Sequence, residues 1–249
     1  MSLAVAIEST DGIVLAADSR ATFGDPRGMT GANDTVKKVF AVTTRSGIAM
    51  VGAAETGASL IETVVARLQA AGGQPDVNTV AETVRLTANE LYQKWFGQLT
   101  YIPTGVGLSP TPRPDVIFLL AGYADGQGGQ ARIITMISSP PFNFAPNMST
   151  TGFAAVGIVP LAVYLLNRLY QRGINLDIAK DLAAHCILET ASQDGKVGGP
   201  LSMAIIKPDN DLVVLNAGQI DEVIERVNRH RESLKNSFLQ LSRGGQAGS

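Results

Sequence analysis

Two short apolar segments near the start of the chain, separated by a tight-turn signal, constrain the fold most strongly. Residues 3–7 and 13–17 contain only Leu, Ala, Val and Ile, and Asp11-Gly12 lies between them. An Asp-Gly pair between two such runs is typical of a β-hairpin. Because the apolar residues do not alternate with polar ones, the pattern predicts strands that are buried on both faces of a sheet.

The rest of the chain predicts groups of strands that alternate with pairs of helices. Further strands are expected at residues 36–43, 47–51, 115–123, 131–136, 153–156, 201–206 and 211–216. Helices are expected at residues 56–71, from an N-cap at Asn78 to beyond Trp95, and at 161–172, 176–191 and 219–241. Residues 22–35 and 103–114, rich in turn-forming residues, are expected to be loops. This order favours layers of sheet between layers of helix, in an α+β class.

Composition and charge narrow the classes of function. Apolar residues make up 45% of the 249-residue chain and charged residues 17%, which excludes a mainly disordered protein. A single cysteine, Cys186, excludes an intramolecular disulfide framework, and only two histidines are present, so neither a metal nor a cofactor is expected. The net charge of −2 gives no reason to expect a nucleic-acid partner.

The sequence also gives no reason to expect a membrane partner. The longest apolar stretch, residues 152–166, contains Pro160 and is too short to span a bilayer. Near the N-terminus, Glu8 interrupts the apolar run that a secretory signal would need. A reducing compartment is therefore the default expectation, which in a bacterium or archaeon is the cytoplasm.

Three residues in the first forty are candidates for chemistry. Met1 is followed by the small residue Ser2, so removal of Met1 would leave a serine hydroxyl and a free α-amine on one residue. Such an amine titrates at roughly 7.7–8.0 and can act as a base for its own hydroxyl. Asp18 closes an apolar strand and Lys38 begins another, so the two could form a buried pair at the ends of adjacent strands. The alternatives are a purely structural ion pair and two exposed residues at the rim.

These segments resemble a proteasome β-type subunit, a member of the N-terminal-nucleophile hydrolases. The resemblance rests on the motif Asp11-Gly12-Ile13-Val14-Leu15-Ala16-Ala17-Asp18-Ser19-Arg20-Ala21-Thr22 and on Lys37-Lys38-Val39-Phe40. The family's spacing from Asp18 back to its nucleophile falls on Ser2, where the family usually has threonine. Two serines of the family's pattern are replaced here, by Ile158 and Val197.

The resemblance implies a set of site residues. The expected catalytic residues are Ser2, Asp18, Lys38, Asp194 and Gly52, whose backbone N–H would form the oxyanion hole. The residues expected to line the substrate pocket are Ala21, Thr22, Val36, Met50 and Ala54. Because Ala21, Val36, Met50 and Ala54 are apolar, this lining favours cleavage after a hydrophobic residue. The activity implied is that of a threonine-type endopeptidase in which serine is the nucleophile.

The resemblance further implies a four-layer αββα sandwich and assembly into a homo-oligomeric ring that encloses its active sites. Residues 1–217 would form the β-type domain and residues 218–249 a C-terminal helical tail. Peptides or unfolded proteins would be the substrates, and an ATPase unfoldase is a further candidate partner. Two alternatives stay open: a non-catalytic ring subunit, to which Ile158 and Val197 point, and an N-terminal-nucleophile amidase acting on a small molecule.

Overall fold

The computed structural model describes residues 2–25, 28–99, 113–125, 129–209 and 211–244. It has two five-stranded sheets, a two-stranded sheet and five helices among these residues. The predicted α+β class is confirmed. Most of the predicted loop at residues 103–114 lies outside the described residues.

The first sheet contains the hairpin that the opening of the sequence predicts. Its strand order is β10-β1-β2-β11-β12, and every neighbouring pair is antiparallel. The strands are β1 (Leu3–Ser9), β2 (Gly12–Ala17), β10 (Phe153–Gly157), β11 (Ser202–Ile206) and β12 (Val213–Val214). The described residues of β2 are all buried, as the unbroken apolar run predicts.

The second sheet has the order β5-β6-β7-β8-β9 and is also antiparallel. Its strands are β5 (Val39–Thr43), β6 (Ser46–Gly52), β7 (Val116–Ala124), β8 (Gln130–Ile137) and β9 (Asn147–Met148). Along β7 the buried side chains alternate between two apolar clusters. Phe118 packs toward the helices and Leu119 toward the first sheet, so both faces of this sheet are covered.

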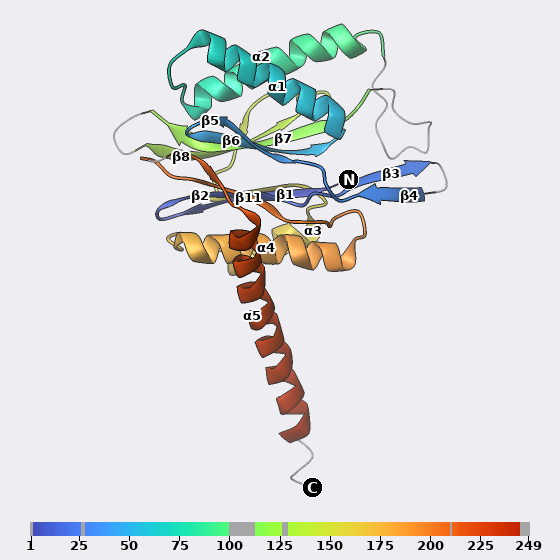
Figure 1. Cartoon of the computed structure of the whole chain (residues 1–249), viewed down its shortest axis with the longest axis vertical. Helices are drawn as coiled ribbons and strands as arrows, with labels where there is room; N and C mark the ends of the chain where they lie inside the picture. Colours follow the sequence, from blue (N-terminus) through green and yellow to red (C-terminus); the bar gives the residue numbers. More distant parts are fainter. Residues whose placement is uncertain (1, 26–27, 100–112, 126–128, 210, 245–249) are drawn as a thin grey trace.

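Helix pairs cover the outer faces of the two sheets (Figure 1). The helices α1 (Ala54–Ala71) and α2 (Val77–Phe96) pack on the second sheet, and α3 (Pro160–Leu169) and α4 (Leu176–Gln193) pack on the first. Figure 1 shows the stacking order as helices, sheet, sheet and helices. A third apolar cluster fills the space between the sheets.

Two helix-end predictions have different outcomes. Gly72 ends α1 with a φ of 72°, a left-handed conformation that favours glycine, as predicted. The prediction that Asn78 caps α2 is wrong. Asp76 is the N-cap, and its Oδ1 accepts a hydrogen bond of 2.8 Å from the N–H of Thr79. Both residue types cap helices well, so composition alone could not choose between them.

The prediction that residues 22–35 form a loop is also wrong. They contain most of an antiparallel hairpin, β3 (Ala21–Asp25) and β4 (Gly28–Asn33), with an irregular register after Phe23. The hairpin extends to one side of the stacked layers (Figure 1). Phe23 is exposed, and the sequence of these strands carries no apolar alternation from which strands could be predicted.

The last helix, α5 (Ala217–Gly244), begins on the face of α4 and then projects away from the body of the molecule (Figure 1). Its first turns bury Ile220, Val223 and Val227 against the cluster beneath α3 and α4. Among the described residues, no helix is both long enough and apolar enough to cross a membrane.

Candidate active site

The β1–β2 hairpin places Ser2 beside Asp18. The register pairs Ala4 with Ala17, so the residue before β1 and the residue after β2 meet at one end of the hairpin. The N–H of Leu3 donates to Asp18 Oδ1 at 3.0 Å, and the N–H of Asp18 donates to the carbonyl of Leu3 at 3.2 Å. The turn at Asp11-Gly12 therefore fixes which two side chains share this end of the sheet.

Lys38 reaches the same point from the other sheet. Its Nζ lies 2.7 Å from Ser2 Oγ and 2.8 Å from Asp18 Oδ1, and it also donates to the carbonyl oxygen of Arg20. The Ser2, Asp18 and Lys38 residues are 4%, 0% and 3% exposed. The predicted ion pair is therefore present. It joins an end of the first sheet to the start of β5 in the second, and not two adjacent strands of one sheet.

The Asp18 carboxylate is fully hydrogen-bonded, which compensates for its burial. In addition to Leu3 and Lys38 on Oδ1, its Oδ2 accepts from the N–H of Arg20 at 3.2 Å and from the N–H of Gly198 at 3.1 Å. A buried carboxylate is costly unless such partners are present. Three backbone N–H groups and one ammonium therefore hold this charge at a fixed position.

Burial lowers the pKa of Lys38 below the ordinary value of 10.5, and the neighbouring Asp18 carboxylate opposes this shift. Lys38 Nζ also donates a hydrogen bond to Ser2 Oγ. A positive charge at 2.7 Å favours the deprotonated form of a hydroxyl. The arrangement can therefore activate Ser2 as a nucleophile, and the proton on Lys38 is more easily lost than on an exposed lysine.

A close backbone approach holds the main chain of Ser2. The N–H of Ile158 donates to the carbonyl of Ser2 at 2.9 Å, and Gly157 pairs with Leu3 across β10 and β1. Gly157 has a φ of 97°, and a Cβ built there would lie 1.9 Å from the Ser2 oxygen. Only glycine fits at this position without displacing Ser2.

A second ion pair, which the sequence reasoning missed, braces the loop after Asp18. The Arg20 guanidinium contacts both carboxylate oxygens of Asp34, at 2.7 and 2.8 Å, and donates to the carbonyl of Gly195 at 3.0 Å. The hydrogen bond from Arg20 lowers the pKa of Asp34. Arg20 stands within the first motif and Asp34 three residues before the second, but nothing in the linear sequence showed that the two residues touch.

Gly52 and Asp194 occupy separate parts of the site region. Gly52 ends β6 with a φ of 100°, and a Cβ there would lie 2.2 Å from the carbonyl of Asp115, so glycine is required. Asp194 ends α4 and its Oδ1 accepts from the N–H of Lys196 at 2.9 Å. Within the described part of the chain, no hydrogen bond joins either residue to Ser2. Asp194 instead shapes the turn that leads to Gly198.

Three of the five predicted pocket residues belong to one apolar cluster or pack against it. Met50 is buried in the cluster beneath α1 and α2, and the half-buried Val36 and Ala54 pack against the same cluster. Ala21 and Thr22 are half-buried at the start of β3. Ala21 directly follows Arg20, whose carbonyl oxygen accepts from Lys38, so β3 begins at the edge of the site.

Ile158 and Val197 face away from polar partners. Val197 is fully buried in the cluster that α3, α4 and the first sheet share, and Ile158 is half-buried against that cluster. Their backbones still belong to the site region, because Ile158 donates to Ser2 and Val197 directly precedes Gly198. At these two positions the site is supported by main-chain hydrogen bonds, and the side chains contribute apolar packing.

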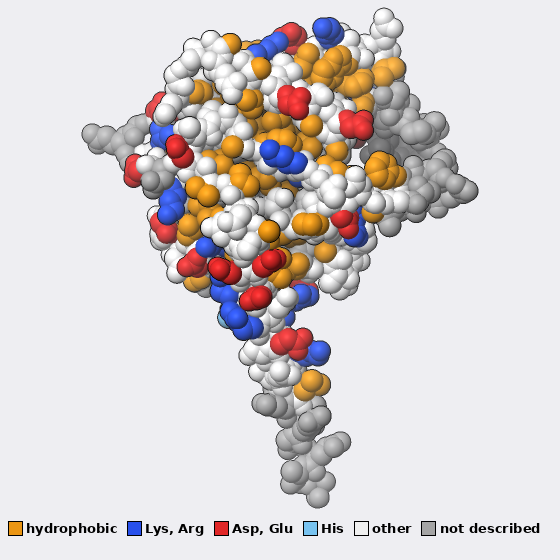
Figure 2. Space-filling model, in the orientation of Figure 1, with side chains coloured by type: hydrophobic (Ala, Val, Ile, Leu, Met, Phe, Trp, Pro, Cys, Tyr) orange, Lys and Arg blue, Asp and Glu red, His pale blue; other side chains and the backbone are white. Residues whose placement is uncertain are grey.

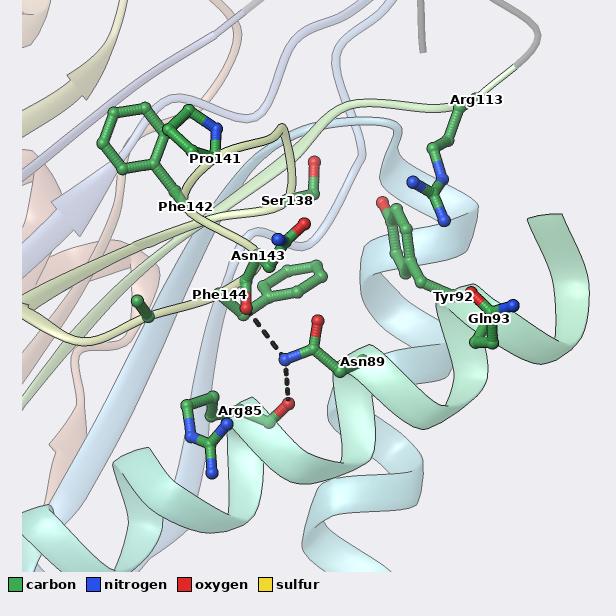
Figure 3. Close-up of a pocket in the computed structure, with 11 residues that line it drawn as sticks. Arg85, Asn89, Tyr92, Gln93, Arg113, Ser138, Pro141, Phe142, Asn143 and Phe144 are labelled. Carbon is green, nitrogen blue, oxygen red and sulfur yellow. Dashed lines mark hydrogen bonds between the residues drawn. The ribbon is translucent and has the colours of Figure 1, made fainter. Parts of the chain in front are cut away.

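A cavity of about 590 Å³ elsewhere in the molecule contains none of the predicted site residues (Figure 3). It lies between α2 and the segment from Ser138 to Ala145, where the Asn89 side chain donates to the carbonyls of Arg85 and Asn143. Among the described residues, no group of three or more His, Cys, Asp or Glu side chains could hold a metal ion.

Comparison with known proteins places the chain in a functional context. The family model "Proteasome subunit" matches residues 2–119, which include Ser2, Asp18, Lys38 and Gly52. The chain is also similar to the proteasome subunit beta of Methanohalophilus mahii, with 24% identity over 226 residues. The match covers 90% of this chain and 94% of that relative. It therefore extends through the segment that contains Asp194.

Proposed function

Because this chain belongs to the proteasome subunit family, as its motifs predict, we propose that it is a peptide hydrolase with Ser2 as the nucleophile. The observation that carries the proposal is the contact of Lys38 Nζ with both Ser2 Oγ and Asp18 Oδ1 in a site shielded from solvent. Nucleophile, cation and orienting carboxylate lie within hydrogen-bond reach of one another, which is the arrangement that activates a hydroxyl.

The mechanism requires cleavage of the bond between Met1 and Ser2, which frees the α-amine of Ser2. Ser2 Oγ then attacks the scissile carbonyl, and the amine takes the hydroxyl proton and passes it to the leaving amine of the substrate. The backbone N–H of Gly52 would donate to the oxyanion, a contribution of about 2.7–4 kcal/mol by analogy with other oxyanion holes. Water hydrolyses the resulting acyl ester and restores the Ser2 hydroxyl. Lys38, held by Asp18, stabilises the developing charge on Oγ throughout.

The proposed substrate pocket is apolar. Met50, Val36 and Ala54 share one cluster, and with Ala21 and Thr22 they would form the wall beside the nucleophile. None of the five carries a charge, so a hydrophobic residue before the cleaved bond is favoured over a basic one. Peptides and unfolded proteins are the proposed substrates.

We also propose the assembly and fold that accompany this activity in the family. The stacking in Figure 1 supports a four-layer αββα sandwich for residues 1–217, with residues 218–249 as a C-terminal tail. Proteasome subunits generally form oligomeric rings, and a homo-oligomeric ring is proposed for this chain, with an ATPase unfoldase as candidate partner and the cytoplasm as location.

A second candidate function is that of a non-catalytic ring subunit. The observation that favours it is the apolar character of Ile158 and Val197, which leaves no hydroxyl at two positions near the main chain of Ser2 and Gly198. The buried contacts of Ser2 with Lys38 favour catalysis, because a purely structural subunit has no need of a hydroxyl beside a buried ammonium. An amidase acting on a small molecule is the third candidate. Hydrolysis of a peptide substrate would favour the peptide hydrolase over this amidase.

Asp34→Ala is expected to lower kcat by roughly tenfold, the scale for outer partners that orient a reactive group. Without Asp34, the Arg20 guanidinium loses its two-point contact with the Asp34 carboxylate. The Arg20 carbonyl that accepts from Lys38 is then no longer braced. The matched control is Glu82→Ala, which removes a similar exposed pair with Arg85 on α2. Both changes should leave the midpoint of thermal unfolding nearly unchanged, because exposed ion pairs contribute little to stability. Equal kcat values for the two variants in a fluorogenic peptide assay would contradict the bracing role.

The function itself is tested by the pH dependence of kcat/KM for a fluorogenic hydrophobic peptide. Hydrolysis should rise as the α-amine loses its proton, at roughly pH 7.7–8.0. It should fall again as Lys38 loses its proton, below the ordinary lysine value of 10.5, because burial lowers the pKa of Lys38. The value of kcat/KM rises and then falls with pH because the proposed mechanism needs a neutral α-amine on Ser2 and a charged Lys38.

Lys38→Arg provides the control for the alkaline limb, because arginine stays charged at these pH values. Where this variant retains activity, the fall at high pH should disappear. A wild-type profile that keeps rising to pH 10.5 would show that neutral Lys38 is the active form, and hydrolysis by Ser2→Ala would contradict the proposed nucleophile.

A further inference from the structure

Two ion pairs hold the first half of α5 to the body of the molecule. Arg226 contacts the carboxylate of Asp181 at 2.8 Å, and Arg231 contacts that of Glu189 at 2.7 Å. Beyond Arg231, residues 232–237 are all exposed, and the helix continues to Gly244. That extension is about 20 Å long at ~1.5 Å per residue, and a helix of this length is marginal in water on its own.

An apolar groove runs along the base of this extension. It has a volume of about 350 Å³ and lies between α5, α4 and the end of α3. Its apolar lining includes Leu169, Ile178 and Leu234, which are 46%, 51% and 61% exposed. Exposed apolar side chains gathered in this way mark an interaction surface more often than isolated ones do.

The sequence of α5 repeats an apolar residue every seven positions, at Ile220, Val227, Leu234 and Leu241. The first two are buried against α4 and the third is exposed beside the groove. A seven-residue apolar repeat is typical of a helix that packs along another helix. The repeat therefore continues beyond Arg231, into the part of the helix that contains the exposed residues 232–237.

The two halves of α5 carry opposite charge. Residues 217–227 hold the acidic Asp221, Glu222 and Glu225 against the basic Arg226 alone. Residues 228–244 hold the acidic Glu232 alone against the basic Arg229, Arg231, Lys235 and Arg243. Figure 2 shows charged side chains gathered where the helix leaves the body. Two such helices attract when antiparallel, because each basic half then lies beside an acidic half, and repel when parallel.

We propose that α5 pairs antiparallel with α5 of a second copy of this chain. The distal half of each helix seats in the groove of the other, around a two-fold axis near Leu234. Such an interface is self-complementary, so one apolar repeat and one charge gradient serve both copies. In this register residue 241 lies opposite residue 227, and residue 238 opposite residue 230. The pairing does not depend on Ser2 or on any catalytic activity.

Oxidative cross-linking tests the contact directly. Cys186 is the single native cysteine and is 0% exposed, so it should not cross-link. A disulfide between two copies can therefore be assigned to the introduced cysteine. Leu234→Cys should form a covalent dimer in the intact full-length protein. The matched control is Asn236→Cys, which is also exposed. Position 236 points about 200° around the helix from position 234, so this variant should not form a covalent dimer. Equal cross-linking of the two variants, or none, would overturn the proposal.

Mixing two variants tests the orientation. His230→Cys and Phe238→Cys should form a mixed disulfide only when combined, because antiparallel pairing brings position 230 of one copy to position 238 of the other. Strong cross-linking of each variant with itself, and none between them, would indicate a parallel pair and contradict the proposal.

Leu234→Asp tests whether the contact holds the particle together. Leu234 lies beyond the buried turns of α5, so the body of the protein should keep its thermal transition. The particle mass, measured by light scattering, should fall by about half as the pairs separate. An unchanged mass, with no cross-linking of Leu234→Cys, would show that another molecule covers the groove.

Discussion

Replacing Lys38 with alanine is expected to lower kcat for peptide hydrolysis by about 10²–10⁴, the scale for loss of a group that assists proton transfer. Lys38 Nζ is within 2.8 Å of both Ser2 Oγ and Asp18 Oδ1, so its removal takes away the positive charge beside the nucleophile. The kcat and KM values for a fluorogenic peptide measure the effect. The loss should appear in kcat, because Lys38 is buried and contacts Ser2 Oγ, the atom proposed to attack the substrate.

The matched control is Lys37→Ala. Lys37 is the neighbouring residue, exposed over the ring of Phe40, and its removal should leave kcat near the wild-type value. Lys38→Ala also leaves the Asp18 carboxylate without its cation, which costs about 3–5 kcal/mol where burial is complete. The three backbone N–H groups on Asp18 should keep the cost toward the lower end of that range. Near-normal turnover in a folded Lys38→Ala protein would make Lys38 a purely structural residue.

Replacing Ser2 with alanine is expected to have the largest effect, a fall in kcat of roughly 10⁶-fold, the scale for deletion of a serine nucleophile. The change removes only the Oγ, and the main chain of residue 2 stays held through its carbonyl by Ile158. Ser2→Thr restores a hydroxyl at the same place and should retain hydrolysis. Ser9→Ala, which deletes a hydroxyl that bonds to Gly12 at the far end of the same strand, is the matched control. Residual hydrolysis by Ser2→Ala above background would point to another nucleophile.

The parts of the fold that could be predicted are those in which local pattern and burial agree. The unbroken apolar runs around Asp11-Gly12 predicted β1 and β2, and the hairpin register then brought Ser2 to Asp18. The Lys38–Asp18 pair could be predicted because a buried carboxylate needs a partner, and Lys38 begins another buried strand. Both inferences use constraints that the sequence carries locally.

Other features depend on contacts that no local pattern reveals. The sequence of the β3–β4 hairpin is rich in glycine and has no apolar alternation, so it resembles a loop. The brace between Arg20 and Asp34 depends on the path of that hairpin, which returns Asp34 to the site. The requirement for glycine at position 157 arises from the approach of β10 to β1, which are far apart in the sequence.

The central claim is that Ser2, with a free α-amine, is the nucleophile, and intact mass tests it most directly. The full-length protein is incubated with an electrophilic peptide inhibitor, and the mass and the modified residue are determined. One adduct per chain is predicted, on Ser2 of molecules that lack Met1, with no adduct on Ser2→Ala or on chains that retain Met1. An adduct on another residue, or an equal yield on chains that retain Met1, would contradict the account.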